Sequence, residues 1–326
     1  MFTRRRIIQV LGAGALLPLA SFAQQQGKVW RVGVLSSGPG ITPYLEVFRQ
    51  ELPALGYVEG KNIVIEWRFA KGVADLLPGL AAVLVQLKMD CLVTNGQNAT
   101  IAAKLVTPTI PIVMGNTDDD PVRTGLVASL ARPGGNVTGF TSISSELSGK
   151  RLQLIKETLP KLSRVGILFD PDSRPASAHI KAIQAAGRTL GVQLHSLEVR
   201  NPEVLEQVFQ AAAKWQAQAL IVVSGGLMSN LRARTASIAD KLRLPVMHTS
   251  LLAVLAGGLM GYGADQSDQF RGAAQYVDRI LKGTKPANLP VQQPTKFEFI
   301  INLRAAKQIG LTIPRSVLVQ ATKVIE

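Results

Sequence analysis

The chain has 326 residues, enough for two lobes with separate hydrophobic cores, and a formal net charge of +14. Its single cysteine, Cys91, excludes an internal disulfide. Lys and Arg are scattered over many predicted helix faces, form no basic run beyond the first residues and do not alternate with aromatic residues. The charge therefore predicts a solvated basic surface and no nucleic-acid partner.

The N-terminus reads as a signal peptide over residues 1–23. Arg4-Arg5-Arg6 forms a positive segment, Ile7 to Leu19 a short apolar one, and Ser21-Phe-Ala23 offers small residues for cleavage. The apolar stretch is shorter than a membrane-spanning helix requires. Because Thr3-Arg-Arg-Arg-Ile-Ile8 also resembles a twin-arginine signal, the export route stays open. We expect a periplasmic protein without a lipid anchor, since no cysteine lies near the cleavage site.

Strands and helices alternate after the signal peptide, which predicts parallel sheets with helices on both faces. The first half contains strands 31–36, 62–67, 90–94 and 110–114, and helices 43–55, 74–87 and 99–105. The second half contains strands 164–169, 192–199, 220–223, 245–247 and 296–302, and helices 176–190, 204–215, 230–242, 267–281 and 303–309.

Three segments are expected to carry the chain between two lobes: 137–142, 259–263 and the proline-rich 285–294. The predicted fold is α/β, with two doubly wound parallel-sheet lobes joined by a multi-strand hinge. Lobe 1 would comprise residues 28–140 plus 264–290, and lobe 2 residues 141–263 plus 291–326. Several crossings form a hinge that lets the lobes close on a small molecule.

A repeated motif supports this division. Arg31-Val-Gly-Val-Leu35 returns as Arg164-Val-Gly-Ile-Leu168, each a run typical of a buried parallel strand. Two later pairs of strand cores match in the same order (89–96 with 218–225, and 109–114 with 243–247). Few residue types suit a buried strand, so a single match would carry little weight. Three matching pairs of strands in the same order along the chain favour two similar lobes.

No arrangement of residues predicts catalysis. The histidines, His179, His195 and His248, lie far apart and lack zinc-binding spacing, and no nucleophile elbow or phosphate-binding loop occurs. We therefore expect no enzyme activity, no cofactor and no metal. His248 follows a predicted strand at the point where a cleft would open; it could contact a ligand or be an ordinary buried histidine.

Small polar residues follow the predicted strands in both halves. In open α/β sheets this edge faces the ligand crevice, although Asn, Ser and Thr also occupy such loops as turns or caps. Residues 95–98 precede a helix whose free N–H groups could hold a carboxylate or phosphate. The candidate ligand-binding residues are Ser36, Ser37, Asn95, Gln97, Asn98, Asn116, Thr117, Asp118, Ser142, Ser224 and Thr249.

Asp118-Asp119-Asp120 is the conspicuous acidic cluster. Its carboxylates could bind a cation or an ammonium group. The alternatives are a solvated loop for Asp118 and Asp119, and for Asp120 the cap of a helix beginning at Pro121.

Several segments resemble the bacterial ABC-transporter substrate-binding proteins, a family that includes a tryptophan-binding member. They are 55–62 (LGYVEGKN), 125–139 (GLVASLARPGGNVTG), 149–152 (GKRL), 276–283 (YVDRILKG), 289–298 (LPVQQPTKFE), 301–303 (INL) and 310–314 (GLTIP). The resemblance spans nearly all of the chain after the signal peptide. It implies a type I periplasmic-binding-protein fold, a ligand between the lobes and delivery to an ABC permease.

Three loops depart from the usual family pattern. Members commonly have one acidic residue before Pro-Val, where this chain has three before Pro121. Ser224-Gly-Gly replaces a frequent Asp-Pro step, and the loop from His248 lacks the Arg and Glu often found there. These departures leave the ligand open.

The sequence thus predicts a secreted, monomeric, non-enzymatic receptor for a small organic molecule, with amino acids, aromatic ones included, first among the candidates. A ligand carboxylate would meet Asn95–Asn98 and Thr117, and an ammonium Asp118 or Asp119. A sensory ligand-binding domain or an enzyme on the same fold is the alternative.

Overall fold

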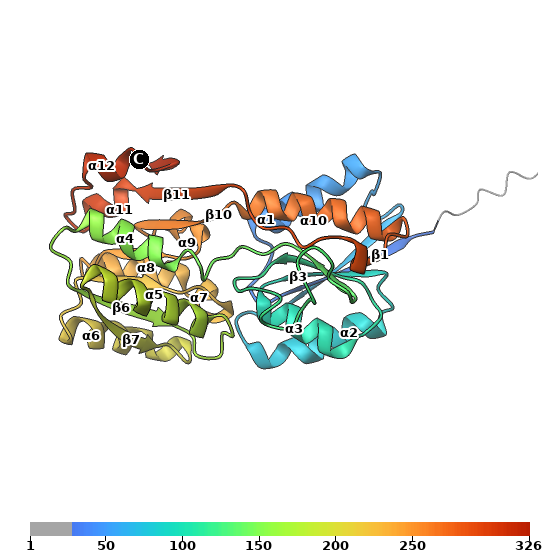
Figure 1. The fold of residues 1–326 in the computed structure, drawn as a ribbon, viewed down its shortest axis with the longest axis horizontal. Coiled ribbons are helices and arrows are strands. Elements are labelled where there is room, and N and C mark those ends of the chain that lie inside the picture. Colours follow the sequence, from blue (N-terminus) through green and yellow to red (C-terminus); the bar gives the residue numbers. More distant parts are fainter. Residues whose placement is uncertain (1–27) are drawn as a thin grey trace, which may run out of the picture.

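The computed structural model describes residues 28–326, so the predicted signal peptide lies outside the described residues. Two α/β lobes lie side by side (Figure 1). Lobe 1 contains a parallel five-stranded sheet in the order β2-β1-β3-β4-β5. Its strands are β1 (Trp30–Ser36), β2 (Ile63–Phe69), β3 (Cys91–Asn95), β4 (Ile112–Asn116) and β5 (Val137–Gly139).

Helices cover both faces of this sheet (Figure 1). On one face lie α1 (Pro43–Glu51) and α10 (Gln266–Leu281), which pack Phe48 and Phe270 against strand residues such as Val34. On the other face lie α2 (Leu77–Gln86) and α3 (Gln97–Val106). Helix α10 comes late in the sequence yet belongs to the core of the first lobe, as the predicted return of the chain required.

Lobe 2 contains a seven-stranded sheet in the order β12-β11-β10-β9-β8-β6-β7. The strands are β6 (Arg164–Phe169), β7 (Gln193–Glu198), β8 (Ala219–Val222), β9 (Val246–His248), β10 (Met260–Ala264), β11 (Phe297–Asn302) and β12 (Lys323–Ile325). The β10–β11 pair is antiparallel, unlike the other pairs of this sheet. Strand β10 leads out of the lobe and β11 leads back in at the same edge, so the two must run in opposite directions.

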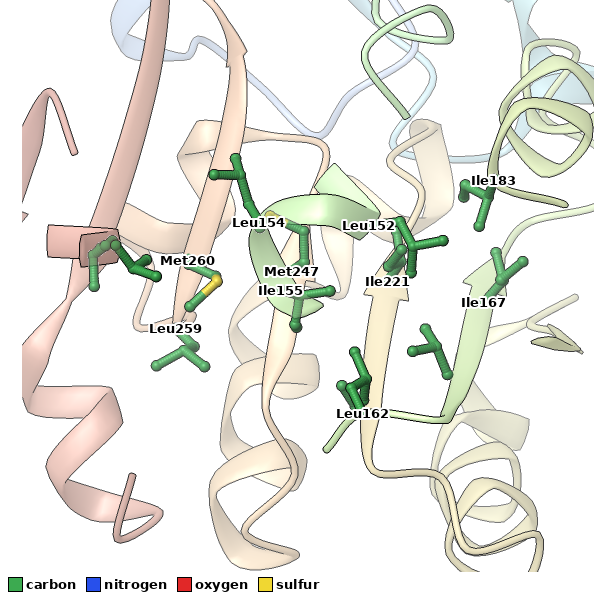
Figure 2. Close-up of a cluster of buried hydrophobic side chains, with 14 of the residues drawn as sticks. Leu152, Leu154, Ile155, Leu162, Ile167, Ile183, Ile221, Met247, Leu259 and Met260 are labelled. Carbon is green, nitrogen blue, oxygen red and sulfur yellow. The ribbon is translucent and has the colours of Figure 1, made fainter. Parts of the chain in front are cut away.

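The helices of lobe 2 enclose a separate core. They are α4 (Ser148–Thr158), α5 (Ala176–Leu190), α6 (Leu205–Lys214), α7 (Gly226–Asn230), α8 (Arg232–Lys241), α9 (Leu251–Leu255), α11 (Leu303–Gln308) and α12 (Arg315–Leu318). Figure 2 shows Leu152 and Ile155 of α4 beside Ile221 and Met247 of the sheet. Short 3-10 helices complete the chain at Leu52–Leu55, Ala74–Leu76, Pro202–Val204 and Pro286–Asn288.

The predicted two-lobe α/β architecture is confirmed, with local corrections. Helix α4 was not predicted because its buried face contains Ser148 and Arg151 beside its apolar residues, which blurs the helical pattern. No helix begins at Pro121: residues 121–125 form turns, in which Asp120 accepts a hydrogen bond from the backbone N of Val122. Residues 260–264 form a strand of the second sheet, so the crossing follows that segment instead of coinciding with it.

The chain passes between the two sheets three times, after β5, after β10 and before β11. The first and third crossings are joined by a bridge between Phe140 and Gln292. The buried Arg151 ties the first crossing to β10, because its guanidinium donates to the carbonyls of Ser144 at 2.6 Å and Tyr262 at 2.7 Å. These contacts hold the hinge segments together.

Candidate functional site

A cleft of about 970 Å³, part of it open to solvent, separates the lobes. Lobe 1 contributes residues that follow β1, β3 and β4, such as Ser37, Gly96 and Asp118. Lobe 2 contributes residues that follow β8 and β9, together with α7 and the first turn of α8. The carboxyl ends of both sheets thus meet at the cleft, the position at which open α/β sheets bind ligands.

Most of the candidate residues from the sequence line this cleft. They are Ser37, Asn95, Gln97, Asn98, Asn116, Asp118, Ser224 and Thr249. Ser36, Thr117 and Ser142 are not among the residues that line it. The hydroxyl of Ser36 supports the cleft from beneath, since it accepts a hydrogen bond from the Asn95 amide at 3.0 Å. Thr117 is fully buried, and its hydroxyl faces the carbonyl of Asp119 at 3.5 Å.

Ser142 lines a neighbouring hollow that shares Tyr44, Thr249 and Leu252 with the cleft, and it also positions a site residue. Its hydroxyl contacts the carbonyl of Thr117 at 3.0 Å and the carboxylate of Asp118 at 3.2 Å. The neighbouring Asp119 is turned inward as well, where it accepts hydrogen bonds from the backbone N of Asp120 and the guanidinium of Arg123. Asp119 therefore holds a turn together, and Asp118 is the member of the acidic cluster that lines the cleft.

The loop between β3 and α3 is shaped to bring backbone into the cleft. Gly96 has a φ of +96°, and a Cβ there would lie 3.2 Å from the hydroxyl oxygen of Ser37. The backbone N of Gly96 donates to the side chain of Asn116 at 3.0 Å. Helix α3 begins at the next residue, two positions before the predicted start, so Gln97 and Asn98 lie in its first turn.

Asn98 bridges the two lobes. Its amide nitrogen donates to the carbonyl of Asp172 at 3.1 Å, and its amide oxygen accepts from the backbone N of Arg174 at 3.2 Å. A second contact joins the side chain of Asn230 in lobe 2 to the carbonyl of Lys71 in lobe 1. The lobes therefore touch across the mouth of the cleft in this structure.

Two opposite charges line the cleft from opposite lobes: Asp118 in lobe 1 and Arg232 at the start of α8 in lobe 2. Burial raises the pKa of Asp118, while the hydrogen bond from Ser142 and the charge of Arg151 lower it. Burial also raises the pKa of the Tyr44 phenol, on which the charges of Asp118 and Arg232 both act, in opposite directions. Tyr44 therefore lies near both charges, and its ring stacks on Phe270 with centroids 5.0 Å apart.

Buried polar atoms without a hydrogen-bond partner gather in this cleft. Within residues 28–326, such atoms belong to Arg31, Ser37, Gln97, Arg164, Thr235, His248 and Gln269. Ser37 and Gln97 line the cleft from lobe 1, and Thr235 and His248 line it from lobe 2. Burial lowers the pKa of His248 to about 4, so its ring is neutral near pH 7. Because buried polar groups are nearly always paired, both walls offer partners for a ligand.

Sequence reasoning missed Tyr44, Arg232 and Thr235. Each lies in the first turn of a helix whose start borders the cleft, and none follows a strand end. Polar residues in the first turns of the predicted helices are the sequence signal that points to them. His248, for which ligand contact and ordinary burial were both open, is buried and lines the cleft.

Over the described range, no group of three or more His, Cys, Asp and Glu side chains is arranged to hold a metal ion. None of the helices that the structure describes is long and apolar enough to cross a membrane.

The comparisons with known proteins agree with this two-lobed, clefted architecture. The family model described as ABC transporter substrate binding protein matches residues 31–325. The chain belongs to this family. The predicted family membership and the type I periplasmic-binding-protein fold are thereby confirmed.

Individual relatives agree with the family assignment. A tyrosine-binding protein from Clostridioides difficile is 23% identical over 280 residues, which cover 86% of this chain and 80% of that protein. A conserved domain protein from Vibrio cholerae is 28% identical with a TM-score of 0.83, covering 91% of this chain and all of that one. A domain from Streptococcus pneumoniae in complex with L-Trp is 24% identical with a TM-score of 0.79, covering 90% and 100% of the two chains.

Proposed function

We propose that this substrate-binding protein receives one α-amino acid between its lobes and delivers it to an ABC permease. The observation that carries the proposal is the set of unpartnered buried polar atoms on both walls of the cleft. Leaving such atoms unpaired costs about 1–3 kcal/mol each. A small polar ligand that pairs with both walls at once would remove this cost and favour the closed arrangement of the lobes.

The charges of the cleft suit a zwitterion. Asp118 would accept the ligand ammonium, as the sequence suggested, and Arg232 would meet the carboxylate. This assignment differs from the one based on sequence, which gave the carboxylate to residues 95–98 and Thr117. The Thr117 hydroxyl is buried beneath the cleft, and the Asn98 amide already bonds to lobe 2. A guanidinium can also hold a carboxylate through two parallel hydrogen bonds.

The relatives support an amino acid with a large side chain, since one is named for tyrosine and another was solved with L-Trp. Tyr44 and the apolar residues Val222, Met228 and Leu252 line the cleft and could pack against such a side chain. We further propose that the protein acts in the periplasm as a monomer and binds its ligand without chemical change, as a receptor does.

Isothermal titration of the protein, after removal of residues 1–23, against the twenty L-amino acids tests this proposal. We expect one or a few to bind, and Asp118→Asn and Arg232→Gln each to weaken binding by about 10- to 100-fold, the value of a hydrogen bond to a charged group. Arg234→Gln, two positions further along α8 and on its exposed side, is the control and should leave affinity unchanged. The proposal is wrong if no amino acid binds.

The pH dependence of ligand affinity distinguishes the role of Asp118 from that of Arg232. Because burial raises the pKa of Asp118, acidification should neutralise this carboxylate earlier than an exposed one and weaken binding of the ammonium. Affinity should therefore fall as pH is lowered in the wild type and in Arg232→Gln. In Asp118→Asn the fall should be smaller.

A further inference from the structure

We propose that Thr235 and His248 form a specificity site that recognises a hydrogen-bonding group at the far end of the ligand side chain. This inference rests on the proposed function, and it adds that the ligand is an amino acid whose side chain ends in a polar atom. The geometry that points to it is the presence of two buried, unpartnered polar side chains in the lobe 2 wall of the same cleft.

Thr235 lies behind Arg232 on the same helix. The two residues are three positions apart on α8, which places them on one face of the helix. Arg232 is partly exposed, whereas Thr235 is fully buried, so Thr235 lies deeper in the cleft. If Arg232 holds the ligand carboxylate at the mouth, the ligand side chain extends inward toward Thr235.

The Thr235 hydroxyl differs from other helical threonines of this chain. A threonine inside a helix usually satisfies its hydroxyl on the carbonyl four residues earlier. Thr158 does so with Leu154 at 2.8 Å, and Thr100 with Gly96 at 3.1 Å. Across residues 28–326, the Thr235 hydroxyl finds no such partner. Its hydrogen-bonding capacity is therefore open to a molecule in the cleft.

His248 is the second member of the site. It ends β9, opposite Val222 of β8 and Gly261 of β10 in the sheet register, and it is 1% exposed. A Cβ at Gly258 would lie 2.5 Å from its Nε2, so this edge of the ring packs against a glycine that does not line the cleft, and Nδ1 is the nitrogen left for a ligand. A neutral imidazole donates from one nitrogen and accepts with the other. Together with a hydroxyl, it can pair with a ligand group that donates, accepts or does both.

The lobe 2 wall of the cleft also has apolar residues. Val222, Met228, Leu252 and Ala253 also line the cleft from lobe 2. Such walls favour an apolar ligand body, while the two polar groups select what lies at its end. A site built to hydrogen-bond a ligand group rejects an analogue without that group, because its own polar atoms are then left unpaired.

Titration with amino acids paired by size tests the inference. Tyrosine with phenylalanine, glutamine with methionine and asparagine with leucine differ mainly in a polar end group. We expect the wild-type protein to prefer the polar member of a pair that it binds by at least about tenfold. Thr235→Val, which keeps the shape and removes the hydroxyl, should reduce this preference, and Thr235→Ser should retain it.

Thr158→Val is the matched control, since Thr158 is a buried helical threonine of the same lobe outside the cleft. It should leave the preference unchanged. His248→Phe should reduce the preference as Thr235→Val does, and the threonine variants decide the question if the histidine variant fails to fold. Equal affinity for the polar and apolar members of each pair would overturn the proposed specificity site, while the proposal of an amino-acid receptor would stand. Binding of no amino acid overturns both proposals.

Discussion

The side-chain amide oxygen of Asn98 in lobe 1 accepts a hydrogen bond from the backbone N of Arg174 in lobe 2, with 3.2 Å between the oxygen and the nitrogen. The same amide donates back to the carbonyl of Asp172 at 3.1 Å. One asparagine therefore satisfies both of its polar ends on the opposite lobe. This contact exists only while the cleft is closed, so it contributes to the free energy of closure.

Replacing Asn98 by alanine should favour the open form. Two hydrogen bonds of about 1 kcal/mol each would be lost from the closed state alone, which predicts an affinity about tenfold or more lower. Small-angle X-ray scattering of the ligand-free protein should show a larger radius of gyration. Asn201→Ala removes a helix cap elsewhere in lobe 2 and should leave both quantities unchanged. If affinity falls without a change in shape, Asn98 contacts the ligand instead.

The stability of the protein should fall on acidification below pH 6.5. Burial lowers the pKa of His248 from 6.5 to about 4, and that of His179 to about 3. Between the folded and unfolded pKa values the unfolded chain binds the proton more readily, so unfolding becomes easier as pH falls. Each histidine should contribute a slope of about 1.4 kcal/mol per pH unit.

Urea unfolding at pH 7, 6 and 5 measures this slope. His248→Phe should lose less stability over this range than the wild type, because one of the two buried histidines is gone. His195→Phe, at the surface where His195 stacks on Trp215, is the matched control for replacing a histidine by phenylalanine outside the core. An identical slope in His248→Phe would contradict the assignment.

Arg151→Met should destabilise the hinge. The variant retains the length of the side chain but leaves the carbonyls of Ser144 and Tyr262 without their donor in the buried interior. We expect a loss of about 3 kcal/mol or more in the free energy of unfolding, as for other broken buried charged networks. Thermal unfolding checks this, with the exposed Lys161→Met of the same lobe as control. A melting temperature equal to that of the wild type would show that Arg151 is dispensable.

Much of the fold followed from local patterns in the sequence. The helix predicted at 176–190 coincides with α5, and the strand predicted at 164–169 with β6, because both have strong apolar periodicity and clear boundaries. Prediction failed where tertiary contacts determine the structure. Helix α4 has a guanidinium on its buried face, and the partners of Arg151 lie in distant segments of the chain.

The candidate site was predictable in outline only. Strand ends led to Ser37, Asn95 and Asp118, since the carboxyl edge of a parallel sheet follows from topology. Whether a polar side chain faces a cleft or turns beneath it depends on a few local hydrogen bonds, as with Ser36, whose hydroxyl accepts from the Asn95 amide and from the backbone N of Gly38. The sequence could not distinguish these cases, nor could it show that Asn98 would bond to the opposite lobe.

The placement of α10 has a consequence for how the protein is made. Phe270 and Val277 of this helix complete the core of lobe 1, although every strand of that sheet precedes them by more than a hundred residues. A nascent chain that has just finished β5 has α1 to cover this side of its sheet but exposes the rest of that apolar face until α10 emerges. The order in which the segments are synthesised therefore differs from the order in which the lobes are completed. Most strands of lobe 2 are synthesised before α10 completes the core of lobe 1.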